Sequence, residues 1–68
     1  MSEAASTPEV DLTEIVGMTP ALAALKTRMT IRELYRNGSK QVIAHDYDPN
    51  RINVTTDAGY ITHVSGIG

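Results

Sequence analysis

Hydrophobic and polar residues alternate most regularly over residues 51–56, where the sequence reads RINVTT. Alternation with a period of two is typical of a β-strand with one buried face, because successive side chains point to opposite sides. Residues 60–64 predict a second strand, and in the connection between them Gly59 can adopt the left-handed conformation of a tight turn. The pattern therefore predicts a β-hairpin. Its first strand would turn inward Ile52, Val54 and Thr56, and outward Arg51, Asn53 and Thr55.

A helical spacing of apolar residues precedes these strands. Thr19 and Pro20 form a typical helix start, with a threonine that caps the first turn and a proline at the first helical position. We expect the helix to end near Met29 or Thr30. The 3.6-residue period predicts an apolar face made of Leu22, Leu25 and Met29, with Ala21 and Ala24 beside it.

Residues 31–36 alternate again and predict a strand after the helix. Asn37-Gly38 then indicates a turn, because this dipeptide favours the backbone of a two-residue hairpin loop. Val42 and Ile43 are apolar, whereas residues 45–50 are polar and include a proline, which predicts an exposed loop. The strand would place on one face Ile31, Glu33 and Tyr35, and on the other Arg32, Leu34 and Arg36.

The chain has 68 residues, which is enough for one small domain. Residues 1–11 are mostly polar with little to bury, so we expect a disordered N-terminal tail, and residues 12–68 would form the domain. Cysteine, phenylalanine and tryptophan are absent. The core must therefore be aliphatic, and no disulfide can reinforce it.

The charge of the chain does not favour nucleic acid as a partner. The formal net charge is −2 and the 6 lysine and arginine residues are scattered, whereas nucleic-acid binding needs a concentrated basic face. No apolar run approaches the ~20 residues of a membrane span. The polar, acidic start of the chain is unlike a secretory signal. We therefore expect no membrane association and a cytoplasmic protein, unless a leader has been removed.

Two patterns suggest metal or catalytic chemistry, but each lacks a required part. His45 and His63 have no neighbouring nucleophile arrangement and no third ligand at a suitable spacing. A calcium-loop spacing begins at Asp46, but Arg51 stands where such a loop needs glycine. We therefore expect a protein that is not an enzyme, with no catalytic residues, no metal and no cofactor. The residues of the calcium-like pattern are Asp46, Asp48, Asn50 and Asp57.

Four segments of the chain, taken in order, resemble one family of small inhibitors. They are Thr13–Thr19 (TEIVGMT), His45–Val54 (HDYDPNRINV), Asp57–Val64 and Val64–Gly68 (VSGIG). They look like the helix entry, the binding loop with its following strand, the closing hairpin and the ending of the potato inhibitor I family of serine protease inhibitors, which includes eglin c. The loop run is also similar to a related bacterial and fungal group of small peptidase inhibitors that includes fungal elastase inhibitors.

The resemblance implies an α+β fold, in which a single helix packs on a small twisted mixed β-sheet and an extended protease-binding loop joins two strands. It places the reactive bond between His45 and Asp46, and assigns loop bracing to Arg51 and Asn53. A guanidinium at Arg51 would suit a pair with the Asp46 carboxylate, because it is planar and can make two hydrogen bonds. The protease-binding loop implied in this way comprises Ile43, Ala44, His45, Asp46, Tyr47 and Asp48.

The function implied is reversible, substrate-like inhibition of a subtilisin-, chymotrypsin- or elastase-like serine endopeptidase, by a monomer. A protease binds an extended peptide as an added strand, and a loop already held in that shape loses less entropy on binding. Departures from the family pattern leave a second hypothesis open, a non-inhibitory interaction module on the same fold. Ala44 stands where threonine is usual, His45 where an apolar residue is commoner, and Asn53 where many members carry a second arginine.

Overall fold

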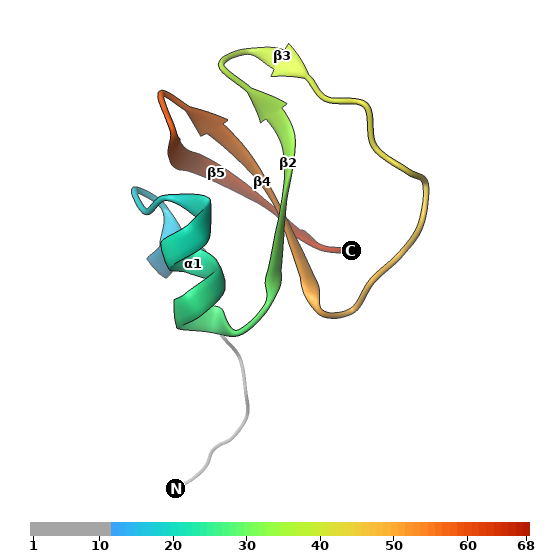
Figure 1. Ribbon diagram of the computed structural model, residues 1–68, viewed down its shortest axis with the longest axis horizontal. Coiled ribbons are helices and arrows are strands. Elements are labelled where there is room, and N and C mark those ends of the chain that lie inside the picture. The colour runs from blue at the N-terminus through green and yellow to red at the C-terminus, as the bar shows by residue number, and fades with distance from the viewer. Residues whose placement is uncertain (1–11) are drawn as a thin grey trace, which may run out of the picture.

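The computed structural model describes residues 12–68, and the predicted N-terminal tail at residues 1–11 lies outside the described residues. The domain belongs to the α+β class, with one α-helix and a four-stranded mixed sheet, which confirms the predicted class (Figure 1). A short 3₁₀ helix, η1, precedes the α-helix. The elements are η1 (Leu12–Ile15), α1 (Pro20–Thr27), β2 (Thr30–Arg36), β3 (Ser39–Lys40), β4 (Arg51–Asp57) and β5 (Tyr60–Ile67).

The strand order in the sheet is β3-β2-β4-β5. β2 and β4 run parallel at its centre, while β3 pairs with the end of β2 and β5 pairs with β4, both antiparallel. Because parallel neighbours need a crossover connection, the chain leaves the sheet after β3 and returns through residues 41–50 to the start of β4. In Figure 1 this connection bows outward at the opposite side of the molecule from α1.

Two tight turns confirm the predicted turn positions. Asn37 and Gly38 have φ angles of 52° and 81°, and Ala58 and Gly59 have φ angles of 56° and 88°. Both connections therefore have the left-handed backbone of two-residue hairpin loops. The Asn37 side-chain oxygen accepts a hydrogen bond of 2.7 Å from the Ala58 backbone N–H. This bond ties the β2–β3 turn directly to the β4–β5 turn.

The core is formed by η1, α1 and one face of the sheet, and it is aliphatic, as the composition predicted. β4 supplies its centre, because alternate residues of this strand are buried. That alternation confirms the inward face predicted for residues 51–56, including Thr56, which is 1% exposed. The buried hydrophobic residues are Ile15, Ala23, Ile52, Val54 and Ile61, and around them pack Leu12, Met18, Met29, Ile31 and Val64.

The α-helix begins where it was predicted to begin but ends earlier. The Thr19 hydroxyl accepts a hydrogen bond of 3.2 Å from the Leu22 N–H, which caps the first turn. The helix ends at Thr27 instead of near Met29, because Arg28 adopts a left-handed conformation with φ 61°. No helix within residues 12–68 is both long and apolar enough to cross a membrane.

The buried face of α1 differs from the prediction. Ala23 is fully buried, whereas Leu22 and Leu25 are 51% and 77% exposed. Of the predicted apolar face, Met29 alone packs against the core, and it lies beyond the end of the helix. The prediction that Leu22 and Leu25 face the core was therefore wrong. This short helix packs on the sheet through the small side chain of Ala23.

β2 contains a bulge that the alternation of its sequence did not predict. Glu33 pairs with Val54 of β4, and Tyr35 pairs with the next residue, Thr55, so Leu34 has no partner in β4. After this extra residue, the side chains of β2 point to the opposite faces of the sheet from those that simple alternation predicts. Arg36 consequently shares a face with Glu33, and its Nη2 donates to the Glu33 carboxylate at 2.8 Å. The predicted grouping of Tyr35 with Glu33, and of Arg36 with Arg32, was wrong.

β5 extends beyond its predicted end at Val64, as far as Ile67. Its outer edge is covered near its start by the segment between η1 and α1. The Gly17 N–H donates to the Ile61 carbonyl at 2.7 Å, and the Ile61 N–H donates to the Met18 carbonyl at 2.8 Å. These bonds satisfy backbone groups that would otherwise be open at the edge of the sheet.

Candidate functional site: the loop between β3 and β4

The connection between β3 and β4, residues 41–50, contains residues 45–50, which the sequence predicted to be an exposed loop. It is anchored at both ends, because the Gln41 N–H donates to the Leu34 carbonyl and the Thr30 N–H donates to the Asn50 carbonyl, each at 2.9 Å. Between these anchors the loop contains no helix or strand, and its tip, residues 44–47, is exposed. A loop with fixed ends and a solvent-facing tip can present its backbone to a partner.

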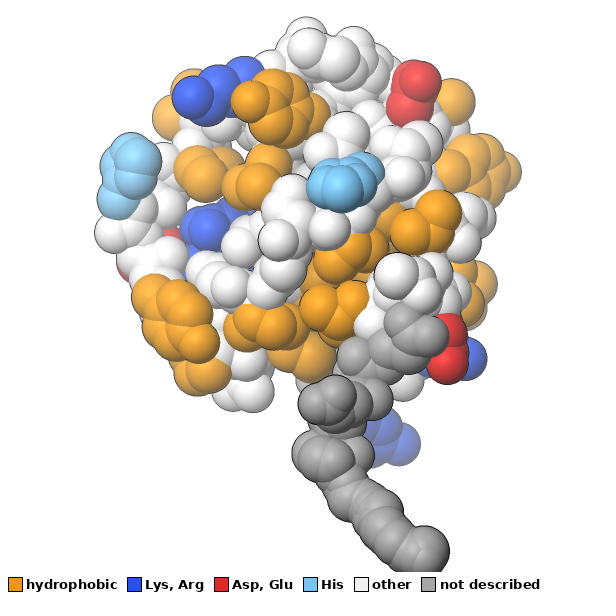
Figure 2. All heavy atoms as spheres, turned by 180° about the vertical axis from the view of Figure 1, so that it is seen from behind, with side chains coloured by type: hydrophobic (Ala, Val, Ile, Leu, Met, Phe, Trp, Pro, Cys, Tyr) orange, Lys and Arg blue, Asp and Glu red, His pale blue; other side chains and the backbone are white. Residues whose placement is uncertain are grey.

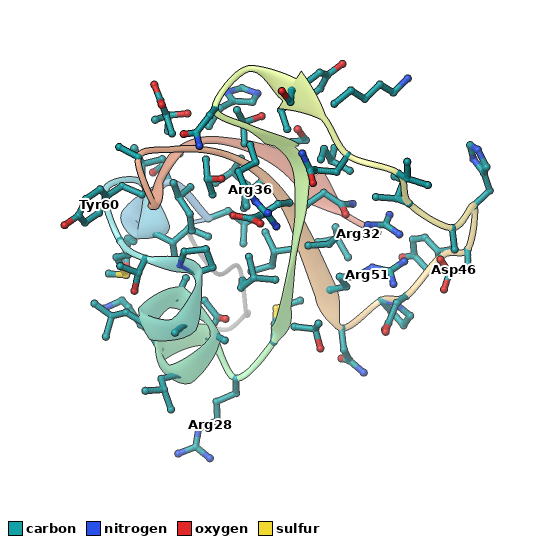
Figure 3. The ribbon with its side chains drawn as sticks, turned by 45° about the horizontal axis from the view of Figure 1, so that its top comes forward. Arg28, Arg32, Arg36, Asp46, Arg51 and Tyr60 are labelled. Atoms are coloured by element: carbon teal, nitrogen blue, oxygen red, sulfur yellow. The ribbon has the colours of Figure 1, made fainter. Side chains whose placement is uncertain are left out.

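Arg51, the first residue of β4, reaches back beneath the tip of the loop (Figure 3). Its Nη2 donates to the Asp46 backbone carbonyl at 2.7 Å and lies 3.3 Å from the Asp46 carboxylate oxygen Oδ1. The structure thus brings these two residues together, although through one nitrogen and not through two parallel bonds. Because the shorter bond goes to the backbone, Arg51 positions the main chain at Asp46 as well as its side chain.

A second guanidinium comes from Arg32 in β2, a residue that the sequence analysis did not assign to the site. Its Nη1 donates to the Ala44 carbonyl at 3.2 Å and lies 3.4 Å from Asp46 Oδ1. Its Nε donates to the Asn53 side-chain oxygen at 2.8 Å. Asn53 makes no direct bond to the loop among the described residues, and instead orients the arginine that does.

Gly68 lies under the loop, at the point where the two guanidinium groups meet. Its oxygen accepts hydrogen bonds from Arg51 Nη2 at 2.6 Å, from Arg51 Nε at 3.2 Å, from Arg32 Nη2 at 3.3 Å and from the Asp48 N–H at 3.2 Å. Its φ of 148° favours glycine, and a Cβ added there would lie 3.6 Å from the Tyr47 ring atom Cδ1. Gly68 therefore connects the end of β5 to the loop through both arginines.

The second half of the loop is held by further bonds within it. The Asp48 carboxylate oxygen Oδ1 accepts from the Asn50 N–H at 2.8 Å. The Asp48 carbonyl accepts from the Arg51 N–H at 3.1 Å, which closes a turn before β4. Tyr47 is 73% exposed, even though its ring lies near Gly68. Residues 46–50 are thus held by both backbone and side-chain bonds.

The first half of the loop is held less tightly. Within the described part of the chain, residues 42–44 take part in one hydrogen bond, which the Ala44 carbonyl accepts from Arg32. Val42 is fully exposed. Two hollows border this half, one of 430 Å³ that Arg32 and Arg51 also line, and one of 500 Å³ that the β2–β3 hairpin also lines. The bracing of the loop is therefore uneven.

The electrostatics of the site favour the charged form of Asp46. The hydrogen bond from Arg51 lowers the pKa of the Asp46 carboxyl, and the positive charges of Arg51 and Arg32 add to this effect. The Arg51 and Arg32 side chains are 13% and 19% exposed, whereas that of Asp46 is 60% exposed. The carboxylate thus sits at the solvent side of two mostly covered guanidinium groups.

All the residues predicted for the loop lie in this connection, and the His45–Asp46 bond lies at its exposed tip. The contribution of Arg32 could be found only from the register of the sheet, which sets Arg32 opposite Asn53. The predicted loop residues are Ile43, Ala44, His45, Asp46, Tyr47 and Asp48.

No group of three or more histidine, aspartate or glutamate side chains within residues 12–68 is placed to hold a metal ion.

Comparison of the chain with models of protein families, with curated proteins and with solved structures gives no match. The interpretation of the site therefore rests on its geometry. That geometry offers an exposed length of backbone, with the carbonyls of Ala44 and Asp46 each held from beneath by a different arginine.

Proposed function

We propose that this protein is a reversible, substrate-like inhibitor of serine endopeptidases, on a fold like that of the potato inhibitor I family. The loop around Ala44–Tyr47 would enter the protease cleft with the His45–Asp46 peptide bond at the catalytic centre. One observation carries the proposal. Arg32 holds the carbonyl of the residue before His45, and Arg51 holds the carbonyl of the residue after it.

This arrangement supports inhibition for two physical reasons. A peptide held in its bound shape before binding loses less conformational entropy in the cleft, which strengthens binding. If the protease cuts the His45–Asp46 bond, the two new ends stay attached to different arginines of one sheet. The ends then remain close together, so that the bond can re-form and products leave slowly. The exposed His45 side chain, which makes no hydrogen bond or ion pair within residues 12–68, is available to a specificity pocket.

The family resemblance is supported by the order of the elements and by the place of the loop. A single helix precedes two parallel strands, and the exposed loop is part of the crossover between them. Many family members carry a second arginine where this chain has Asn53. Here Arg32 of β2 brings a second guanidinium to the loop, and Asn53 accepts a hydrogen bond from it. The departure at Asn53 is therefore compatible with a braced loop.

The alternative is a non-inhibitory interaction module on the same fold. The observation that favours it is the loose first half of the loop, where Ala44 offers no side-chain hydroxyl and residues 42–44 receive one hydrogen bond within the described part of the chain. Such a loop could bind a partner protein and yet be cut quickly by a protease. The two functions differ in the kinetics of protease inhibition.

Progress curves with subtilisin-, chymotrypsin-, elastase- and trypsin-like enzymes test the proposal. We expect stoichiometric, slowly reversible loss of activity for at least one of them. His45→Ala should change the inhibition constant, whereas His63→Ala, a matched change of the exposed histidine on β5, should leave it unaltered. Rapid degradation of the chain by every enzyme, with no inhibition phase, would favour the interaction module.

A further inference from the structure

The hollow of 500 Å³ beside the first half of the loop is lined mostly by residues outside the loop tip. Leu34 and Tyr35 of β2 and Lys40 of β3 form one wall, and Val42, Ile43 and His45 form the other. Its volume falls within the roughly 300–1,000 Å³ range of small-molecule ligand pockets. Figure 2 shows hydrophobic side chains spread over this face of the molecule, some of them beside the loop.

We propose that this hollow is a second contact surface for the protease, and that it takes an apolar side chain presented beside the protease cleft. The inference rests on the proposed function, because His45 belongs both to the hollow and to the proposed reactive bond. A protease whose cleft covers the His45–Asp46 bond must therefore come close to the rim of the hollow.

Exposure of apolar groups supports an apolar occupant. Val42 is 102% exposed and Tyr35 is 42% exposed. Covering a fully exposed valine side chain removes apolar surface from water, which favours binding. Val42 and Tyr35 both line this one hollow, so a partner that covers it buries both apolar groups at once and binding becomes more favourable. Single exposed hydrophobic residues scattered over a surface do not have this effect.

The charges around the hollow specify the occupant further. Lys40 and His45 are its ionisable basic residues, and no carboxylate lines it. Lys40 makes none of the ion pairs within residues 12–68. A partner segment that carries an aspartate or glutamate next to its apolar side chain would therefore be complementary. The occupant is thus a surface segment of the protease with an apolar residue beside an acidic one.

The test uses the enzyme of the panel that the unmodified protein inhibits most tightly. We expect Tyr35→Ala to raise the inhibition constant about tenfold, as loss of a central aromatic contact does. Tyr60→Ala removes a tyrosine at the start of β5 that is 54% exposed, against 42% for Tyr35, and it should change the constant less than about twofold. Lys40→Glu should also weaken inhibition, and its effect should shrink at high salt.

The outcomes separate this inference from the proposed function. If the unmodified protein inhibits but Tyr35→Ala and Lys40→Glu both inhibit equally well, the hollow is not a contact surface, although the inhibitor proposal stands. If the unmodified protein inhibits no enzyme, both proposals fail. If sedimentation shows a dimer that Tyr35→Ala dissociates, the hollow belongs to an interface between two copies of the chain, and the inference is overturned. Unchanged melting temperatures of the variants exclude misfolding as the cause.

Discussion

The Nη2 nitrogen of Arg51 lies 2.7 Å from the backbone carbonyl oxygen of Asp46, but 3.3 Å from its carboxylate. The arginine therefore acts on the main chain next to the proposed reactive bond more closely than on a neighbouring charge. The same nitrogen lies 2.6 Å from the oxygen of Gly68, so one guanidinium links the loop to the end of the sheet.

From these distances we predict that Arg51→Ala weakens protease inhibition more than Asp46→Ala does. The first change removes the hydrogen bonds to the Asp46 carbonyl and to the Gly68 oxygen, whereas the second leaves both in place. A hydrogen bond from a charged donor contributes about 1.5–3 kcal/mol, so Arg51→Ala should raise the inhibition constant about tenfold or more.

The double variant completes a cycle that measures the coupling of Arg51 to the Asp46 carboxylate. We expect a modest non-additivity, because the ion pair is only part of the contact. Equal losses from the two single changes, or a larger loss from Asp46→Ala, would contradict a brace that acts chiefly through the backbone.

A second prediction concerns Arg32, the arginine of β2. Arg32→Gln should raise the inhibition constant and speed cleavage after His45, because it releases the Ala44 carbonyl. Arg28→Gln removes the same charge at a side chain that makes no hydrogen bond or ion pair within residues 12–68. Inhibition constants for the two variants provide the measurement. If Arg32→Gln and Arg28→Gln raise the inhibition constant equally, inhibition depends on the net charge of the protein and not on the contact of Arg32 with the loop.

A third prediction follows from the lowered pKa of Asp46. A carboxyl with a lower pKa in the folded state stabilises that state above its unfolded pKa of about 3.9, and the stabilisation disappears as the pH falls through the folded pKa. Amide exchange of residues 44–48 should therefore increase, relative to the intrinsic rate, as the pH falls below about 4. Asp46→Asn should remove this pH dependence at the loop. If amide exchange in the Asp46→Asn variant keeps its full dependence on pH, another carboxyl group causes that dependence.

The parts of the fold that depend on short stretches of sequence could be predicted. Asn37-Gly38 and Ala58-Gly59 form turns because their own backbone preferences decide the conformation, and the alternation in residues 51–56 matches the buried face of β4. The start of α1 depends on Thr19 and the residues next to it, so it was also correct.

The parts that depend on tertiary packing could not be predicted. The sequence makes Leu22 and Leu25 the apolar face of α1, but the approach of the helix to the sheet buries Ala23 instead. The site shows the same limit. The loop residues are consecutive and could be recognised together, whereas Arg32 reaches Ala44 from twelve positions away in the sequence, through the pairing of β2 with β4.

A fourth prediction tests the packing of α1. Ala23→Leu should lower the free energy of unfolding by about 1–3 kcal/mol, because added volume in a filled core forces the surroundings apart. Leu25→Ala should change it by less than about 0.5 kcal/mol, since the side chain is exposed. Urea unfolding of both variants provides the comparison. A large loss for Leu25→Ala would mean that the helix buries the face that its sequence pattern suggested.

The most direct test of the inhibitor proposal is mass spectrometry of the chain during long incubation with the protease that it inhibits. We predict one slow cut, between His45 and Asp46, that approaches an equilibrium between intact and cut chains. Purified cut protein, added to fresh protease, should regain the intact mass in part. Rapid cutting at several positions, or a cut elsewhere with no return to the intact chain, would contradict the proposal.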